Sequence, residues 1–398
     1  MTSQRTLART SSLLLLTSAL AIGCADDAVV GDDEAAGTDT ETGDSTSTET
    51  GDSTSTDDDV GPTDTGTTET TESTDTTEST DTTETTDTGD GSLDCLNAQF
   101  LNGDSPGPAY GNYDLTIGSH CDGTNNQDIT DIERVVFLGD SVTVGTPPTN
   151  PDDFYRSIMA EELSMIFGLD SPNFLWKQYD PINGTALIKY DGDFASCSEW
   201  GARTDDLLGG GQQLDGCFSG GDFNKRTLVV MTLGGNDIAA IAKDAIEGVA
   251  FDALMTDAEG MVQQMRDGVT WLLEPDRFPN GVFVVYANVY EFTDATADLL
   301  SCPAAGVAGF NANPDDPATL IDVVTYINNE YATLAAETQT DMAFLFENFC
   351  GHGFHAGDTE SVCYRGPDQE TWFDLTCIHP TPTGHQELAD MFLNVITE

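Results

Sequence analysis

Residues 134–145 read Arg134-Val135-Val136-Phe137-Leu138-Gly139-Asp140-Ser141-Val142-Thr143-Val144-Gly145. A short continuous apolar run bounded by turn residues is typical of a fully buried β-strand, and here such a run leads directly into Gly-Asp-Ser. A serine just past a buried strand lies at the carboxyl edge of the sheet, where open α/β sheets form their binding sites. We therefore expect Ser141 to be a nucleophile.

The Gly-Asp-Ser tripeptide is weak evidence by itself, because it occurs four times in the chain. The other copies end at Ser45, Ser53 and Ser105, and only the copy that ends at Ser141 follows an apolar run. The alternative interpretation of Ser141 is a serine that caps a turn or a helix. The stretches that follow along the chain decide between the two.

Apolar runs and amphipathic periods alternate from residue 134 to the end of the chain. This alternation predicts a parallel sheet that is covered by helices on both faces. The further strands are expected at 227–233, 282–287 and 342–346, and the helices at 152–167, 238–273 in two pieces, 320–336 and 384–396.

Three more stretches carry residues that would complete a serine-based site. Gly201 lies in a polar loop, Asn236 follows the expected strand 227–233, and His379 lies in a loop just before the last expected helix. A hydroxyl that attacks an acyl carbon needs a base, and the resulting oxyanion needs preorganised donors. Each residue alone could be a turn former, a cap or an ordinary loop histidine, but together they supply these roles.

The chain resembles an SGNH hydrolase of the GDSL esterase/lipase family over most of residues 134–396. The resemblance rests on Gly139-Asp140-Ser141, on Gly201, on Gly234-Gly235-Asn236-Asp237 and on His379-Pro380, in the order that the family has. It implies a flavodoxin-like three-layer α/β/α sandwich with a five-stranded parallel sheet. The one G-x-S-x-G match in the sequence, at residues 103–107, follows no apolar run and lies in a turn-rich segment, which disfavours an ordinary α/β-hydrolase.

The same resemblance implies the role of each site residue. Ser141 is the nucleophile and an oxyanion donor through its backbone, Gly201 gives a second backbone donor, Asn236 gives a side-chain donor, and His379 is the general base. The family usually places an aspartate three residues before the histidine, where this chain has Thr376.

The group that orients His379 is therefore open between two candidates. Asp374, five residues before His379, could fold back and supply a charge, or a backbone carbonyl near Thr376 could accept the ring N–H. We favour Asp374 as the third catalytic residue, because a carboxylate stabilises a developing imidazolium better than a neutral carbonyl does. In either case only the backbone of Thr376 is expected to take part.

Composition excludes several partners. The chain has 13 Lys+Arg against 70 Asp+Glu, for a formal net charge of −57, so a nucleic-acid partner is excluded. No C-x-x-C pair is present in the sequence, and His352 and His355 lack a third ligand nearby, so we expect neither a metal nor a cofactor.

The first 24 residues have the pattern of a targeting segment. A positive start with Arg5 and Arg9 precedes a short apolar stretch, and Ala21-Ile22-Gly23-Cys24 resembles a bacterial lipobox in which Cys24 receives lipid. We predict a lipoprotein signal peptide at 1–24, a disordered acidic, Thr-rich stalk at 25–91 and a hydrolase domain at 92–398. The protein is then exported and anchored by lipid to a membrane of a bacterial cell envelope.

Eight cysteines remain if Cys24 carries lipid, and an even number in an exported chain indicates disulfides. Proximity in the sequence favours Cys95–Cys121 and Cys197–Cys217, and leaves Cys302–Cys350 and Cys363–Cys377 as the other two pairs.

These observations predict a surface-anchored serine ester hydrolase that acts on a small-molecule or lipid ester through an acyl-enzyme. One alternative is a carbohydrate O-deacetylase. The other is a non-catalytic surface-binding lipoprotein that keeps the fold, although a binding protein would not need Ser141, Gly201, Asn236 and His379 together.

Overall fold

The run that begins at residue 134 forms the centre of a parallel sheet. The structure, a computed structural model, describes residues 94–208 and 213–398. In it β1 (Arg134–Gly139) is buried along its whole length and pairs in parallel with β5 (Phe194–Ser196) and β6 (Thr227–Thr232). Beyond β6 the sheet continues in parallel through β7 (Val282–Ala287) to β8 (Asp341–Ala343). This strand order, β5-β1-β6-β7-β8, is that of flavodoxin-like folds.

The edge of the sheet holds a sixth strand. β4 (Tyr190–Asp191) pairs in antiparallel fashion with β5 in a tight hairpin. The predicted five parallel strands are therefore confirmed, and the sheet has one antiparallel edge strand in addition. Such an edge is common on otherwise parallel sheets. A separate two-stranded ribbon joins β2 (Tyr179–Asp180) to β3 (Thr185–Ala186).

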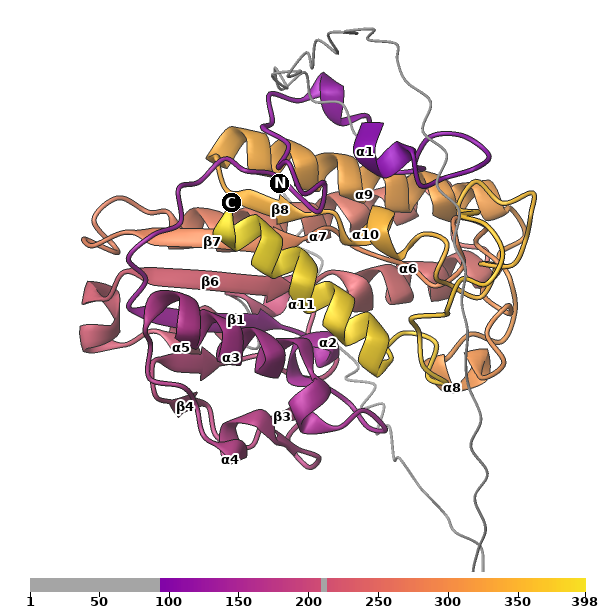
Figure 1. Ribbon diagram of the computed structural model, residues 1–398. Coiled ribbons are helices and arrows are strands. Elements are labelled where there is room, and N and C mark those ends of the chain that lie inside the picture. Colours follow the sequence, from indigo (N-terminus) through magenta and orange to yellow (C-terminus); the bar gives the residue numbers. More distant parts are fainter. Residues whose placement is uncertain (1–93, 209–212) are drawn as a thin grey trace, which may run out of the picture. The chain divides into compact units, whose positions relative to one another are not determined.

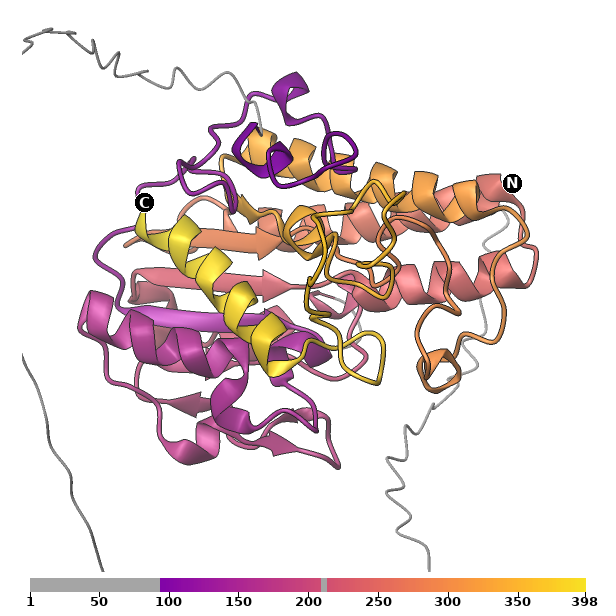
Figure 2. The same ribbon diagram turned by 45° about the vertical axis from the view of Figure 1, so that its right-hand side comes forward.

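Helices cover both faces of the sheet, as the alternating pattern predicts. α3 (Tyr155–Phe167) and α11 (Pro382–Thr397) pack together on one face, in front of the strands in Figure 1. α6 (Gly235–Ile246), α7 (Phe251–Leu272) and α9 (Pro317–Thr338) pack together on the other side, which Figure 2 shows more openly. The shorter helices are α1 (Asp94–Asn97), α2 (Ser141–Val144), α4 (Phe174–Lys177), α5 (Gln213–Cys217), α8 (Ala305–Ala308) and α10 (Leu345–Phe349).

One predicted element is partly wrong. Residues 342–346 were expected to form a strand, but β8 ends at Ala343 and Phe346 lies in α10. An apolar run does not by itself distinguish a buried strand from a buried short helix, and all five residues of α10 are buried. The predicted signal peptide with Cys24 and the predicted stalk lie outside the described residues. Within the described ranges, no helix is both long and apolar enough to cross a bilayer.

The strand register brings three distant stretches to one edge of the sheet. Gly139 at the end of β1 pairs with Thr232 at the end of β6. On the other side, the N–H of Glu199 donates to the carbonyl of Gly139 at 3.1 Å. Ser141 lies two residues after Gly139, and Gly201 lies two residues after Glu199. Asn236 lies four residues after Thr232. The three residues therefore emerge at the carboxyl edge beside β1 and β6, where the direction of chain winding reverses.

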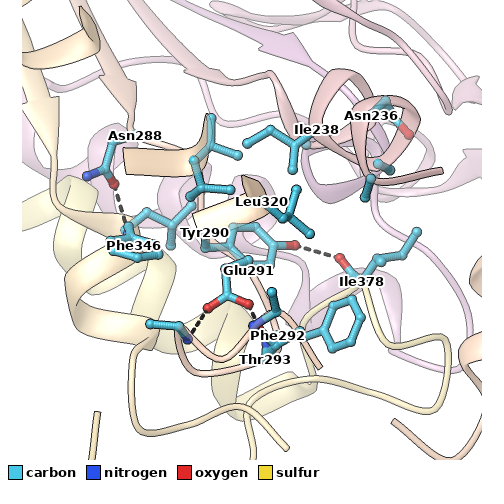
Figure 3. Close-up of a pocket in the computed structure, with 18 of the residues that line it drawn as sticks. Asn236, Ile238, Asn288, Tyr290, Glu291, Phe292, Thr293, Leu320, Phe346 and Ile378 are labelled. Atoms are coloured by element: carbon cyan, nitrogen blue, oxygen red, sulfur yellow. Dashed lines mark hydrogen bonds between the residues drawn. The ribbon is translucent and has the colours of Figure 1, made fainter. Parts of the chain in front are cut away.

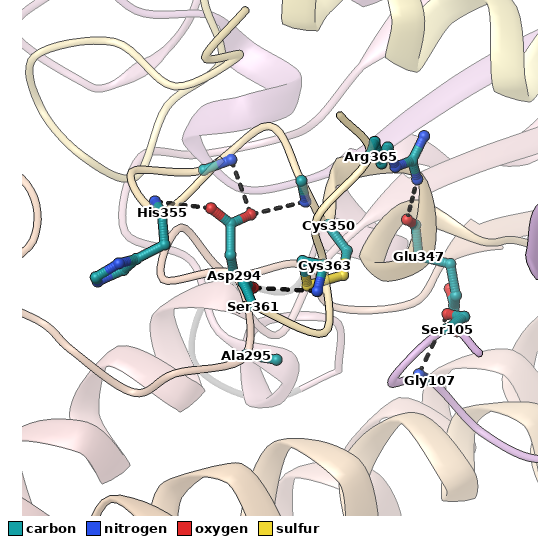
Figure 4. The surroundings of a disulfide bond; sticks show 12 residues. Ser105, Gly107, Asp294, Ala295, Glu347, Cys350, His355, Ser361, Cys363 and Arg365 are labelled. Carbon is teal, nitrogen blue, oxygen red and sulfur yellow. Dashed lines mark hydrogen bonds between the residues drawn. A yellow bond between two sulfur atoms is a disulfide. The ribbon is translucent and has the colours of Figure 1, made fainter. Parts of the chain in front are cut away.

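Four disulfides brace the described residues. Cys95–Cys121 and Cys197–Cys217 are as predicted. The other two pairings were predicted wrongly, because the bonds are Cys302–Cys377 and Cys350–Cys363. Figure 4 shows the second of these beside Asp294, a buried carboxylate that accepts backbone N–H bonds from Gly351, Gly353 and His355. Folding of this loop around Asp294 places Cys350 next to Cys363, a proximity that sequence spacing does not reveal.

Candidate active site

The turn after β1 explains each residue of Gly139-Asp140-Ser141. Gly139 has φ of 137°, and a Cβ there would lie 2.2 Å from the carbonyl oxygen of Thr232, so no other residue fits. Asp140 is the N-cap of α2, and its side chain accepts from the N–H of Val142 at 2.9 Å. Ser141 is therefore the first helical residue and not the cap, which leaves its hydroxyl free for other contacts. The alternative of a capping serine does not apply here.

His379 reaches Ser141 from the loop before α11. Its Nε2 atom lies 2.9 Å from the Oγ atom of Ser141, and both side chains are buried. Burial lowers the pKa of His379 from 6.5 to about 4, because the charged ring is poorly solvated there. The imidazole is therefore neutral near pH 7 and able to accept a proton from the serine hydroxyl.

The partner of the other ring nitrogen differs from the prediction. The Oγ1 atom of Thr376 lies 2.7 Å from Nδ1 of His379, and this hydroxyl is in turn 2.5 Å from Oδ1 of Asp374. The expectation that Asp374 or a backbone carbonyl contacts the ring is corrected accordingly, since a threonine hydroxyl lies between the carboxylate and the imidazole. This contact was not predicted from the sequence, because only the backbone of Thr376 was expected to take part.

Asn236 and Gly201 are joined to the same edge by hydrogen bonds. The Nδ2 atom of Asn236 donates to the carbonyl of Ala202 at 2.9 Å, which leaves its second N–H for another acceptor. On the other side of Gly201, the indole N–H of Trp200 donates to the carbonyl of Gly145 at 3.0 Å. Gly201 itself has φ of 76°, a backbone conformation that favours glycine.

A second contact holds the Gly201 loop against α6. The Asp237 carboxylate accepts from the N–H of Thr204 at 3.1 Å. Burial raises the pKa of Asp237 to about 6, and burial likewise raises the pKa of Asp140 to about 7. Both acidic residues of the two motifs therefore act in local structure, as a cap and as a loop anchor.

An apolar pocket opens beside Ser141 and Asn236. Its volume is about 120 Å³, and it extends between α6, α9 and the segment after β7. Apolar side chains make most of the wall, namely Val142, Leu233, Ile238, Ala239, Ala242, Val289, Phe292, Ala297, Leu299, Phe310, Leu320, Ile321, Val324, Leu345, Phe346 and Ile378. This pocket could not be predicted from the sequence, because its lining comes from segments far apart in the chain.

Two polar side chains of the pocket, Tyr290 and Glu291, are hydrogen-bonded to the protein itself. Figure 3 shows the Tyr290 hydroxyl donating to the carbonyl of Ile378, at 2.6 Å. The Glu291 carboxylate accepts from the backbone N–H groups of Thr293 and Ala295. The first contact also ties the segment after β7 to the residue that precedes His379. The surface that lines the pocket is therefore mainly hydrocarbon.

The two other loop histidines have partners of their own. His352 stacks on Trp372, with ring centroids 3.5 Å apart, and its Nδ1 atom lies 2.9 Å from the carbonyl oxygen of Glu370. His355 contacts the carboxylate of Asp298 at 3.1 Å. In residues 94–208 and 213–398, no three His, Cys, Asp or Glu side chains are grouped in a way that could hold a metal ion.

A flavodoxin-like sheet that carries serine, glycine, asparagine and histidine motifs at its carboxyl edge defines the SGNH class of hydrolases. The chain belongs to the GDSL-like lipase/acylhydrolase family, whose model matches residues 137–387. The resemblance seen in the sequence is thus confirmed for the family and for the fold. Ester hydrolysis is the activity that this family membership supports.

The solved structures to which the chain is similar are distant in sequence. An extracellular lipase from Streptomyces rimosus is 18% identical, with a TM-score of 0.41 over 66% of this chain and 99% of that one. The esterase EstA from Pseudoalteromonas is 11% identical, with a TM-score of 0.34 over 66% and 96%. A two-domain esterase active on acetylated mannans is 12% identical, with a TM-score of 0.36 over 67% and 50%. No match to a curated protein is found.

Proposed function

We propose that the protein is a serine ester hydrolase that cleaves esters of apolar acyl chains through an acyl-enzyme on Ser141. The observation that carries the proposal is the 2.9 Å contact between Nε2 of His379 and Oγ of Ser141, at the mouth of an apolar pocket. A neutral imidazole in contact with a serine hydroxyl is the arrangement that activates serine as a nucleophile.

The proposed reaction has two halves. Oγ of Ser141 attacks the ester carbonyl carbon and its proton passes to Nε2 of His379. The tetrahedral intermediate then collapses, and the departing alcohol takes that proton. Water attacks the resulting acyl-serine with His379 again as base, which releases the acid and restores the serine. The oxyanion in both halves is held by the backbone N–H groups of Ser141 and Gly201 and by the side-chain amide of Asn236.

The pocket favours an acyl chain over an acetyl group. An acetyl group needs space for a single methyl, whereas the wall extends along α6 from Asn236 to Ala242 and reaches Val324 on α9. Burying methylene groups there gains about 0.8 kcal/mol for each CH₂ removed from water. A carbohydrate O-deacetylase needs room for only a methyl group on the acyl side, so an apolar pocket of this extent supports that alternative less well.

We further propose that the protein is exported and held at a bacterial membrane by lipid on Cys24. The support is the lipobox-like stretch that ends at Cys24, and the acidic, Thr-rich tract that follows it would act as a spacer. Replacing Cys24 by Ser should move the full-length protein from the membrane fraction to the soluble fraction. Unchanged partitioning into detergent would contradict the anchor and would leave the hydrolase proposal intact.

The test of the activity is a panel of 4-nitrophenyl esters from acetate to palmitate with the full-length protein. We expect kcat/KM to rise with acyl length beyond acetate and then to fall. Ser141→Ala should remove several orders of magnitude in turnover while the circular dichroism spectrum stays unchanged. Ser105→Ala is the matched control, because Ser105 ends another Gly-Asp-Ser copy, in a loop before β1. A folded Ser141→Ala variant with near-wild-type turnover refutes the proposal, and a maximum at acetate favours the deacetylase.

A further inference from the structure

We propose that the side-chain hydroxyl of Thr376 is the group that orients His379, and that Asp374 acts on the ring only through this hydroxyl. Thr376 is then a positioning residue for the general base of the proposed esterase, on which this inference rests. A series of hydrogen bonds, Ser141–His379–Thr376–Asp374, takes the place of a direct contact between carboxylate and imidazole.

Counting the available protons gives the direction of each hydrogen bond in this series. An ionised Asp374 can only accept, so the single hydroxyl proton of Thr376 goes to its Oδ1 atom. The oxygen of Thr376 is then an acceptor towards His379, and Nδ1 of the ring must carry the hydrogen. The remaining nitrogen, Nε2, presents its lone pair to the hydroxyl of Ser141. The hydroxyl thus selects the one neutral tautomer that can take the serine proton.

The local backbone holds the Asp374 carboxylate against Thr376. Its Oδ1 atom also accepts from the N–H of Thr376 at 2.7 Å, so the carboxylate is folded against its own turn. The N–H of Asp374 donates to the carbonyl of His379 at 2.8 Å, and the N–H of Cys377 donates to the carbonyl of Asp374 at 3.0 Å. These bonds fix the loop between Asp374 and His379 as one unit. The position three residues before the histidine, where the family usually has aspartate, is thereby filled by a hydroxyl that has a carboxylate behind it.

A second interpretation is that the hydroxyl of Thr376 only satisfies Asp374 and that the histidine contact is incidental. The two interpretations differ in what happens to the ring when the hydroxyl is removed. If the hydroxyl selects the tautomer, Thr376→Val changes the protonation of the ring nitrogens of His379. If it only completes the turn, the ring is unaffected and the variant loses stability alone.

The experiment compares Thr376→Val, Thr376→Ser and Asp374→Asn in the full-length protein. Valine has the shape of threonine without the hydroxyl, and serine keeps the hydroxyl. We expect Thr376→Val to lower kcat by about 10²-fold or more with little change in KM, as loss of a correctly protonated base does. Thr376→Ser should restore turnover. Asp374→Asn should cost less than Thr376→Val, because the amide oxygen of asparagine can still accept the hydroxyl proton.

A double variant, Thr376→Val with Asp374→Asn, shows whether Asp374 acts on His379 through Thr376 or independently of it. If Asp374 acts only through Thr376, adding Asp374→Asn to Thr376→Val changes kcat little. Effects that multiply would overturn the proposal, and so would a Thr376→Val protein with wild-type kcat. Thr376→Ala makes the same comparison if the valine variant does not fold.

A readout without substrate keeps this test separate from that of the proposed function. The ¹⁵N resonances of the imidazole, assigned by comparison with His379→Asn, report which nitrogen of His379 carries the hydrogen. We expect hydrogen on Nδ1 in the wild-type protein and in Thr376→Ser, and a mixture of tautomers in Thr376→Val. If the wild-type protein cleaves no ester, the proposed function fails, and these resonances still decide the role of Thr376. Identical tautomers in all variants would overturn that role.

Discussion

Nε2 of His379 lies 2.9 Å from Oγ of Ser141, although the two residues are 238 positions apart in the chain. The serine is placed by the end of the first parallel strand, and the histidine is placed by the loop before the last helix. Their contact therefore depends on packing of α11 against the same face of the sheet as α3, near the turn after β1. A contact built in this way forms only when the whole domain is folded.

The buried environment of His379 gives a prediction for the pH profile. Burial lowers the pKa of His379 to about 4, below its ordinary 6.5, so the ring stays neutral and basic to a lower pH than usual. Because kcat/KM reports the free enzyme, its acid limb should have its midpoint near pH 4. A midpoint near 6.5 would show that the ring is solvated in solution and would contradict the buried geometry.

Asp140 supplies the control for this profile, since burial raises its pKa to about 7 and it adjoins Ser141. Asp140→Asn keeps an oxygen that can accept from the N–H of Val142 and removes this second titration. The limb near pH 4 should persist in that variant.

The lowered pKa of His379 also affects stability, because folded His379 binds fewer protons than the unfolded chain between pH 4 and 6.5. Its contribution to the free energy of unfolding is therefore lost as the pH falls through this range.

The fold could be predicted from the sequence where burial leaves a continuous apolar run. The strand at 282–287 matches β7, and the strand at 227–233 matches β6 to within one residue. The same rule failed at 342–346, because after Ala343 the chain remains buried but turns into α10. The apolar run correctly predicts that these residues are buried. Whether they form a short strand or a short helix depends on the surrounding structure.

The site could be predicted where a motif follows a strand and not where it depends on loop geometry. Ser141 and Asn236 emerge from paired strands, so their convergence follows from the register. The role of the Thr376 hydroxyl depends on how the loop folds back on Asp374, and the pairing of Cys302 with Cys377 depends on which loops lie side by side. A three-residue spacing could have pointed to Thr376, had its hydroxyl been considered as an acceptor.

The disulfide Cys302–Cys377 predicts a link between redox state and activity. Cys377 lies between Thr376 and His379, and the bond ties this loop to the segment after β7 across 75 positions. Replacing both cysteines by alanine should destabilise the protein by about 4 kcal/mol on the loop-entropy estimate. Turnover at low temperature, where the variant is folded, should also fall, because the loop that holds His379 is freed.

The matched control is the double alanine variant of Cys95 and Cys121, a pair in the segment before β1. It should lose stability and retain the wild-type kcat when it is folded. Denaturant unfolding and initial rates on one soluble ester measure both quantities. Equal kcat in the two double variants would mean that the Cys302–Cys377 bond does not support the site.

The wall formed by α6 predicts how acyl length is selected. Asn236 stands at the start of this helix, and Ala239 and Ala242 line the pocket three and six residues further on. With a rise of about 1.5 Å per residue, these positions lie about 4.5 Å and 9 Å along the helix from Asn236. Ala242→Phe should reduce kcat/KM for long acyl chains and spare short ones, and Ala239→Phe should move the cut-off to shorter chains. The same ester panel measures both variants, and an unchanged chain-length profile in both would place the acyl chain elsewhere.

The last prediction concerns Asn236 as an oxyanion donor. One N–H of its amide is bonded to the carbonyl of Ala202 at 2.9 Å, and the other is left for another acceptor, which we propose is the substrate oxygen. Asn236→Ala removes both, so part of any loss could come from release of the Gly201 loop. The bond from the N–H of Thr204 to Asp237 still holds that loop in the variant, which limits this second effect. We therefore expect kcat to fall by about 10²–10³-fold, as on removal of one oxyanion donor in other serine hydrolases.

KM should change little in this variant, because the donor acts mainly on the charge that develops in the transition state. Asp237→Asn is the control for the loop: its amide oxygen can still accept from Thr204, so kcat should stay close to the wild-type value. Binding of a boronic acid, which forms a tetrahedral adduct with serine, gives an independent measure, and Asn236→Ala should weaken it by a factor similar to the loss in kcat. If KM rises as kcat stays constant, Asn236 positions the substrate and does not stabilise the oxyanion, and Ser141 and Gly201 are then the donors that remain.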